Sequence, residues 1–306
     1  MTSTVNPSVD TTFTAYKIPL SIIAKWPPAN YVNPERRWWV APYTILWTTA
    51  GSLLLAARLY SRWTKAAGKF GFDDILIVCA WIFGIAFSAL AIWGVLVAGF
   101  DRHVWDVPPI TAERGALSAW LSEFFFTFST VFSKMSILVF HRRLVSRTSN
   151  KYMKWAIYAA MGFTIVYLLS FVAFLTFICS PTNASWKSLN ISYNEPYKCA
   201  YRGIFDPMWG IVSVVSDVYA IVLPEILVKR LQIKLRQKLI LAVLFGCGIS
   251  TVATGIARSV FLRRLSTDPL RDLTWIAFDT YIFTVPECHL AIICASAPAL
   301  KGFFDA

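Results

Sequence analysis

Residues 116–140 (ALSAWLSEFFFTFSTVFSKMSILVF) decide the fold class, because they are long enough to cross a bilayer and yet contain two ionisable side chains. About 20 mostly apolar residues span the hydrocarbon core of a membrane. Glu123 lies in the first half of this stretch and Lys134 in its last third. A charge at mid-membrane costs at least ~2.5 kcal/mol, so such residues usually face a protein interior or a wet cavity. Lys134 therefore either extends to the membrane surface or faces neighbouring helices and needs an acidic partner.

The rest of the chain also has the composition of a membrane protein. Of its 306 residues, 57% are hydrophobic and 15% are charged, whereas soluble domains contain about 45–50% and about 25%. The net charge of +12 comes from basic residues beside the apolar runs. This placement favours anionic lipid headgroups over nucleic acid as the partner. Six cysteines without a Cys-x-x-Cys pair, and only three histidines, predict no metal site.

We predict an all-α, seven-transmembrane helix bundle in a plasma membrane or endomembrane, with the N-terminus outside and the C-terminus in the cytosol. The expected spans are residues 38–60, 75–99, 116–140, 155–179, 207–228, 239–261 and 273–297. Residues 1–37 form a polar outer segment, residues 38–300 the membrane domain and residues 301–306 a short cytosolic tail. The orientation follows from Lys and Arg, which concentrate in the loops assigned to the cytosol. The loop after the sixth span, with Arg263 and Arg264, is an exception.

The loop after the fourth span has features of an outer or lumenal loop. It contains N-glycosylation sequons at Asn183 and Asn190, which are used only on the lumenal face. They support a lumenal location for this loop. Cys179 and Cys199 flank the loop, and a disulfide between them is permitted in that compartment. The alternative is two unpaired cysteines.

Ionisable residues in other spans could meet Lys134. Spans three, five and seven run in the same direction, so counting from each start places Asp217 and Glu287 near the midplane. Glu225 falls in the inner third with Lys134 and is its depth-matched candidate partner. The candidate ligand-pocket residues are Glu123, Lys134, Asp217, Glu225, Glu287 and His289. The alternative is that these residues only brace the helices.

Local signals predict several features of individual spans. Pro286 lacks a backbone N–H, which frees a carbonyl one turn earlier and could open the helix for a ligand. Arg258 lies toward the outer end of its span, and we expect it to extend to the membrane surface. Asp73 or Asp74 can cap the second span. Glycines in the sixth span should allow close helix approach; they are Gly246, Gly248 and Gly255.

Several short blocks, in a fixed order, resemble a known family. They are Arg58-Leu-Tyr-Ser-Arg62, Phe72-Asp73-Asp74, residues 99–103 ending in His103, Lys134-Met-Ser-Ile-Leu-Val-Phe140 with Arg142, Ser216-Asp217, Leu223-Pro224, Leu231-Gln232 with Lys238, residues 245–248, Arg258, residues 272–275 from Asp272 to Trp275, Glu287, and residues 294–300. Over residues 43–304 the chain resembles the fungal rhodopsin-domain integral membrane proteins. That group includes surface-sensing receptors and proteins encoded in secondary-metabolite gene clusters.

The resemblance implies a seven-helix, receptor-like fold without a retinal cofactor. A retinal Schiff base needs a lysine in the seventh span, and residues 273–297 contain none. The third span ends in Phe140-His141-Arg142 instead of Asp-Arg-Tyr, so no motif supports coupling to a G protein. No cysteine precedes Cys79, so the cysteine-rich outer domain of some members is not expected. The long cytoplasmic tail common in the family is also missing, which weakens the case for signalling.

Three functions fit these observations. The first is a receptor-like protein that binds a small or lipidic ligand among its helices, with a cytosolic partner at the basic inner loops. The second is a membrane-embedded enzyme of secondary metabolism that uses Asp217 or Glu287 as a general acid. In that case Trp209 and Trp275 could stabilise a cationic intermediate. The third, a transporter, is least favoured, because the helix count is odd and no internal repeat is visible.

Overall fold

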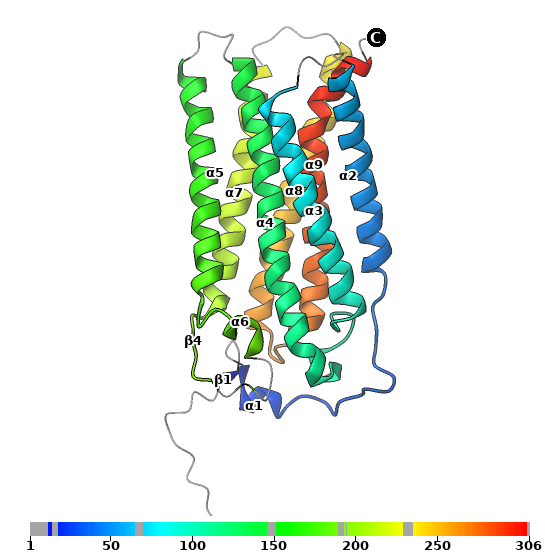
Figure 1. The fold of residues 1–306 in the computed structure, drawn as a ribbon, viewed down its shortest axis with the longest axis vertical. Helices are drawn as coiled ribbons and strands as arrows, with labels where there is room; N and C mark the ends of the chain where they lie inside the picture. Colours follow the sequence, from blue (N-terminus) through cyan, green and yellow to red (C-terminus); the bar gives the residue numbers. More distant parts are fainter. Residues whose placement is uncertain are drawn as a thin grey trace, which may run out of the picture.

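The computed structural model describes residues 12–13, 18–64, 70–145, 151–188, 193, 195–228 and 235–304. Seven long helices run side by side through this part of the chain (Figure 1). They are α2 (Val40–Trp63), α3 (Phe72–Leu96), α4 (Pro109–Val145), α5 (Lys151–Phe177), α7 (Arg202–Val228), α8 (Leu235–Thr267) and α9 (Leu273–Phe304). Each is long and apolar enough to cross a membrane. The prediction of an all-α bundle of seven spans is confirmed, whereas the orientation of the termini stays a prediction.

The short elements gather at one end of the bundle (Figure 1). They are α1 (Leu20–Ile23), the 3₁₀ helix η1 (Val104–Asp106), α6 (Ala184–Lys187), and two antiparallel strand pairs. The strand β1 (Thr12–Phe13) pairs with β2 (Ile18–Pro19), and β3 (Cys179–Ser180) pairs with β4 (Lys198–Cys199). A disulfide joins Cys179 to Cys199, so we call this the disulfide end. The helix α9 finishes at the opposite end, which we call the C-terminal end (Figure 1).

The helix α4 is longer than the span predicted from hydropathy. It begins at Pro109, a residue suited to the first helical position because its missing N–H would have no intrahelical partner there. Its additional turns are polar and continue the helix beyond the apolar stretch at both ends. The start of α3 is closed by Asp74, whose carboxylate accepts a hydrogen bond from the backbone N–H of Gly71 at 2.9 Å.

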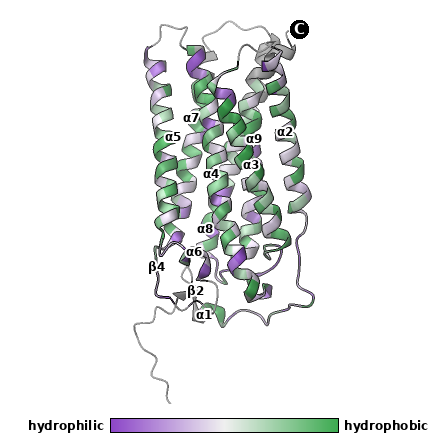
Figure 2. Ribbon diagram, viewed as in Figure 1, coloured by the Kyte–Doolittle hydropathy of each residue, from purple (hydrophilic) through white to green (hydrophobic). Residues whose placement is uncertain are grey.

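The helices α4 and α9 form the centre of the bundle. The helices differ in how much of an 18-residue apolar stretch of each is buried. The buried share is 61% in α4 and 67% in α9, compared with 22% in α2 and 28% in α5. Hydrophobic residues cover most of the length of the helices (Figure 2). Many large apolar side chains, such as Leu169 and Leu53, are exposed on the outer surface. Such a surface suits contact with lipid.

Glycines allow α7 and α8 to approach closely. A Cβ added at Gly248 would lie only 2.7 Å from Ile221 Cγ1, and one at Gly255 would lie 3.2 Å from Val214 Cγ2. On α7, a Cβ added at Gly210 would clash with the side chain of Ser259. Gly246 differs from this group, because an added Cβ would have no atom within 4 Å among the described residues. The prediction is therefore confirmed for Gly248 and Gly255, whereas no close approach is seen at Gly246 among the described residues.

Candidate functional site: a cavity at the disulfide end

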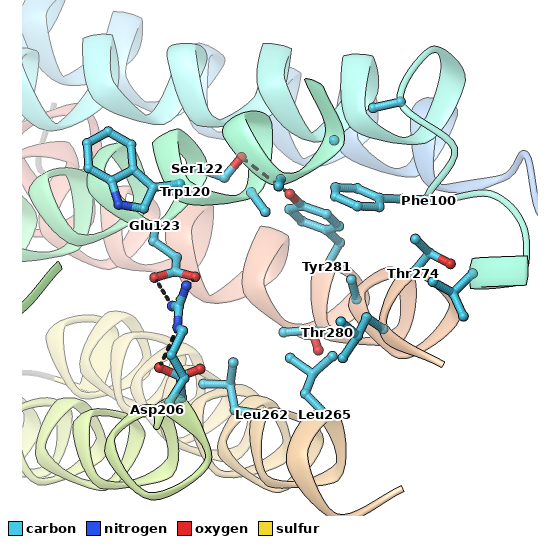
Figure 3. Close-up of a pocket in the computed structure, with 18 of the residues that line it drawn as sticks. Phe100, Trp120, Ser122, Glu123, Asp206, Leu262, Leu265, Thr274, Thr280 and Tyr281 are labelled. Carbon is cyan, nitrogen blue, oxygen red and sulfur yellow. Dashed lines mark hydrogen bonds and ion pairs between the residues drawn. The ribbon is translucent and has the colours of Figure 1, made fainter. Parts of the chain in front are cut away.

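A cavity of about 760 Å³ opens between the helices at the disulfide end. Such a volume is typical of small-molecule sites, which are mostly apolar with a few polar groups. Its lining comes mainly from α4, α7, α8 and α9, and is rich in aromatic and apolar side chains (Figure 3). These include Phe87, Phe100, Trp105, Trp120, Phe126, Tyr167, Phe171, Trp209, Leu262, Leu265 and Tyr281.

One wall of the cavity is charged. Arg202 of α7 donates hydrogen bonds to both carboxylate oxygens of Glu123 on α4, and its Nε lies 3.2 Å from Asp206 Oδ1 (Figure 3). The side chain of Glu123 is 29% exposed, whereas those of Arg202 and Asp206 are 10% and 6% exposed. This group therefore ties α4 to α7 and presents mainly a carboxylate to the cavity.

Arg258 of α8 also lines the cavity, against the expectation that it extends to the membrane surface. Its Nε lies 2.7 Å from Glu287 Oε2, and its Nη2 lies 3.0 Å from Glu287 Oε1. Its guanidinium carbon is 4.8 Å from the ring centroid of Phe126. The expectation was wrong because a bidentate partner on α9 holds the side chain inside the bundle, where it is buried.

Lys134 faces the bundle, and its acidic partner is Asp217. Lys134 Nζ lies 3.0 Å from Asp217 Oδ1 and also donates hydrogen bonds to Ser216 Oγ and to the backbone oxygen of Ser213. The depth comparison had favoured Glu225, whose side chain lies outside the described residues. Side chains on a helix lean toward its N-terminus, so Lys134 extends toward the depth of Asp217 and away from that of Glu225. Lys134, Asp217 and Glu287 are not part of the cavity lining.

Three consecutive residues after Pro286 connect α9 to other helices. Glu287 pairs with Arg258, and the thiol of Cys288 donates to Ser129 Oγ of α4 at 3.2 Å. His289 Nε2 lies 2.9 Å from Ser88 Oγ on α3 and 3.1 Å from Thr48 Oγ1 on α2. His289 therefore braces helices and does not line the cavity.

The carbonyl that Pro286 frees belongs to Ile282, and α2 supplies its partner. The hydroxyl of Tyr43 donates to the oxygen of Ile282 at 3.0 Å. The helix is therefore not opened for a ligand at this point, as the proline had suggested, because a side chain of the same chain already satisfies the carbonyl.

At the C-terminal end, four buried charged residues and the exposed Arg143 form an ion cluster. Arg58 Nη2 lies 2.8 Å from Asp73 Oδ2 and 2.7 Å from Asp74 Oδ1, and Arg58 also donates to the backbone oxygen of Ala295. Asp73 additionally contacts Arg62 Nη2 at 3.0 Å and Arg143 Nη1 at 2.6 Å. The aspartates thus act mainly as counter-ions that join α2, α3, α4 and α9.

At the disulfide end, a stack of side chains contains the other family-motif residues. The imidazole of His103 stacks between Trp105 and Trp275, with centroid distances of 4.7 and 3.9 Å, and its Nδ1 hydrogen-bonds to Asp272. The guanidinium carbon of Arg37 lies 3.5 Å from the centroid of Trp275. Trp275 therefore packs within the protein and is not part of the cavity lining, whereas Trp209 is.

The sequence did not reveal that residues 20–39, which we call the strap, cover the cavity. Ile23, Trp26, Pro27, Ala29 and Tyr31 line it. Trp26 Nε1 donates to the oxygen of Leu270 at 2.7 Å, and the backbone N–H of Asn30 donates to Asp106 Oδ1 at 2.7 Å. The sequence feature that could have predicted this packing is the presence of large aromatic residues in a polar, proline-containing segment. Such residues are uncommon in segments that are fully solvated.

The loop between α5 and α7 is closed by the Cys179–Cys199 disulfide. Asn183, the first sequon residue, immediately precedes α6 and is half-buried. Its side-chain oxygen accepts a hydrogen bond from the hydroxyl of Tyr193 at 3.4 Å. Asn190 lies outside the described residues.

The fold and the apolar helices define a multi-pass integral membrane protein. Comparison with known families gives the more specific assignment. The fungal rhodopsin domain family matches residues 57–306, and the chain belongs to this family.

Three curated relatives give context. The chain is 26% identical over 270 residues to "Receptor GIN3" of Arthrobotrys oligospora, covering 86% of this chain and 61% of the relative. It is 23% identical to "Wortmanamides biosynthesis cluster protein C" of Talaromyces wortmannii, with coverage of 85% and 68%. It is 27% identical to a "SAT4 family membrane protein" of Emericella nidulans, with coverage of 67% and 50%. The chain thus spans between half and about two thirds of these relatives' lengths. No solved structure matches it.

Proposed function

We propose that this protein is a receptor-like membrane protein that binds a small or lipidic ligand in the cavity at the disulfide end. The proposal rests on the cavity, which has the volume and the mixed apolar and charged lining of a small-molecule site. We further propose that the disulfide end faces outward, as the basic-residue distribution predicts. The absence of lysine from residues 273–297 supports a ligand other than retinal.

The strap supports ligand entry from the disulfide end. Several of its residues line the cavity, and side-chain to backbone hydrogen bonds attach it to the loops after α8 and before α4. The end of the strap next to α2 is held more firmly, because Arg37 contacts Asp279 at 2.6 Å and its backbone N–H donates to the oxygen of Asp101. We therefore expect residues 23–31, and not the whole strap, to open without unfolding of the protein. A ligand could therefore exchange without separation of the seven helices.

Binding of a neutral apolar probe tests the cavity directly. We would measure equilibrium dialysis of tritiated ethylbiphenyl against the protein in lipid nanodiscs, after subtraction of empty nanodiscs. We expect saturable binding to the wild type. Thr280→Trp should weaken it about tenfold or more, because the indole would occupy cavity volume beside Tyr281 (Figure 3).

As a control, tryptophan is introduced at a position on the outer surface of the bundle. Leu169 on α5 is 64% exposed, so Leu169→Trp should leave binding unchanged. Equal binding by the two tryptophan variants would reject the cavity as a ligand site. Absence of saturable binding to the wild type, for this probe and for the charged probes described below, would also reject it.

An enzyme remains the second candidate, because one relative is named for a biosynthesis cluster. The two proposed acids are less suited to it than the sequence suggested. Asp217 is paired with Lys134 and Glu287 with Arg258, and neither carboxylate lines the cavity. An enzyme should lose turnover in Asp217→Asn or Glu287→Gln while retaining substrate binding, whereas a receptor should show a graded change in ligand response.

A further inference from the structure

We propose that the ligand of the cavity is an apolar amine whose protonated nitrogen is held by the carboxylate of Glu123. This inference rests on the proposed ligand-binding function and specifies the chemical class of the ligand. It starts from which charged atoms a molecule in the cavity can reach.

Among the charged side chains of the cavity wall, Glu123 is the most accessible. Its side chain is 29% exposed, compared with 10% for Arg202 and 8% for Arg258. A carboxylate has two oxygens and about four lone-pair positions, so it can bind Arg202 and a ligand donor together. A ligand entering the cavity therefore meets a hydrogen-bond acceptor with negative charge.

The two guanidinium groups are engaged by carboxylates. Arg202 directs its Nη2 at Glu123 and its Nε at Asp206, and Arg258 makes a bidentate contact with Glu287. An anionic ligand that approached either arginine would be brought close to a carboxylate at the same time. Like charges at short range are unfavourable in a site of low dielectric, so the wall disfavours anions.

The aromatic lining also favours a cation. Trp120 and Phe126 lie three residues before and three residues after Glu123 on α4, and both line the cavity together with Tyr281 of α9. Figure 3 labels Trp120, Glu123 and Tyr281. The faces of aromatic rings attract cations. The cavity already uses this interaction, since Arg258 lies over the ring of Phe126. The same rings provide the apolar surface for the body of the ligand.

Three probes of matched shape test the proposal. Biphenylmethylamine is a cation at neutral pH, ethylbiphenyl is its neutral isostere, and biphenylacetate is an anion. We expect wild-type protein in nanodiscs to bind the amine about tenfold to a hundredfold more tightly than ethylbiphenyl, the range that a charge-assisted hydrogen bond provides. Glu123→Gln should bring the two affinities together, whereas Glu123→Asp should retain a preference for the amine.

The control removes a carboxylate from another arginine pair. Asp279 contacts Arg37 at 2.6 Å and does not line the cavity, so Asp279→Asn should preserve the preference for the amine. If Glu123→Gln fails to fold because it leaves Arg202 without this partner, the triple variant Glu123→Gln/Arg202→Gln/Asp206→Asn removes the charges of all three residues and serves instead.

The outcomes separate the ligand class from the cavity function. A preference for biphenylacetate, equal binding of amine and isostere, or a preference that survives Glu123→Gln would overturn the amine proposal. In each of these cases, loss of binding in Thr280→Trp would leave the cavity function intact. Absence of saturable binding of every probe would overturn both.

Discussion

At the residue scale, three carboxylates that lie between the helices are matched by cations from other helices. Glu123 meets Arg202, Asp217 meets Lys134, and Glu287 meets Arg258. An unpaired charge in such a place would be far more costly than the pair, so removal of one partner should be more harmful than removal of both. These pairs specify which helices lie next to each other.

Tyr43 provides a test of the same principle for a neutral group. In Tyr43→Phe the oxygen of Ile282 loses its donor, since Pro286 cannot supply one. We expect the free energy of unfolding to fall by about 1–3 kcal/mol, the cost of an unsatisfied buried polar group. Thermal and denaturant unfolding of the purified protein in detergent would measure it.

A second substitution distinguishes this cause from lost packing. In Tyr43→Phe/Pro286→Ala the restored N–H of residue 286 can bond the oxygen of Ile282 within α9. The double variant should therefore be more stable than Tyr43→Phe alone. If adding Pro286→Ala gives no recovery, the hydroxyl does not act through this carbonyl.

At the element scale, the close packing of α7 and α8 depends on positions without a side chain. Packing through small residues is a general means of helix association in membranes, where lipid offers no hydrophobic driving force between helices. Gly210 and Gly248 supply the closest approaches, from α7 and α8 respectively.

Gly248→Val should push α8 away from Ile221 and lower stability by about 1–3 kcal/mol, the usual cost of overpacking. Gly246→Val is the matched control, because it makes the same change on the same helix where an added Cβ meets no described atom within 4 Å. The measurement is the midpoint of thermal unfolding for both variants. Equal destabilisation would show that β-branching in the helix, and not the α7 contact, is responsible.

At the scale of the whole molecule, the two ends of the bundle have different contents. The disulfide end holds the cavity and the strap, and the C-terminal end holds the ion cluster of Arg58, Asp73, Asp74, Arg62 and Arg143. The helix α9 reaches both, through Tyr281 at the cavity and through the backbone of Ala295 at the cluster. The cluster therefore fixes the helices at the end away from the proposed ligand.

Asp73→Asn should destabilise the fold by about 3–5 kcal/mol, because it removes one of the two carboxylates that balance the buried guanidinium groups of Arg58 and Arg62. Asp279→Asn removes the partner of one arginine at a site where the carboxylate is 25% exposed, and should cost about 1 kcal/mol or less. Unfolding in detergent compares the two. Similar losses in both variants would show that burial of the cluster does not determine its contribution.

Much of the architecture could be predicted from hydropathy. A span must satisfy its backbone hydrogen bonds internally, so a long apolar run in a membrane has to be a helix. Seven such runs therefore established the fold class, and the order of short motifs indicated the family. The residues of the charged interior could also be recognised, because an ionisable side chain in an apolar run needs a polar neighbour.

Only the tertiary structure decided which of these residues meet. Lys134 pairs with Asp217, and Arg258 turns inward to Glu287, although depth along the spans favoured other arrangements. The cavity and its strap were equally invisible in the sequence. Contacts between helices depend on how each helix is rotated and where its side chains lean, and the apolar pattern of a membrane span constrains its length far more than its rotation.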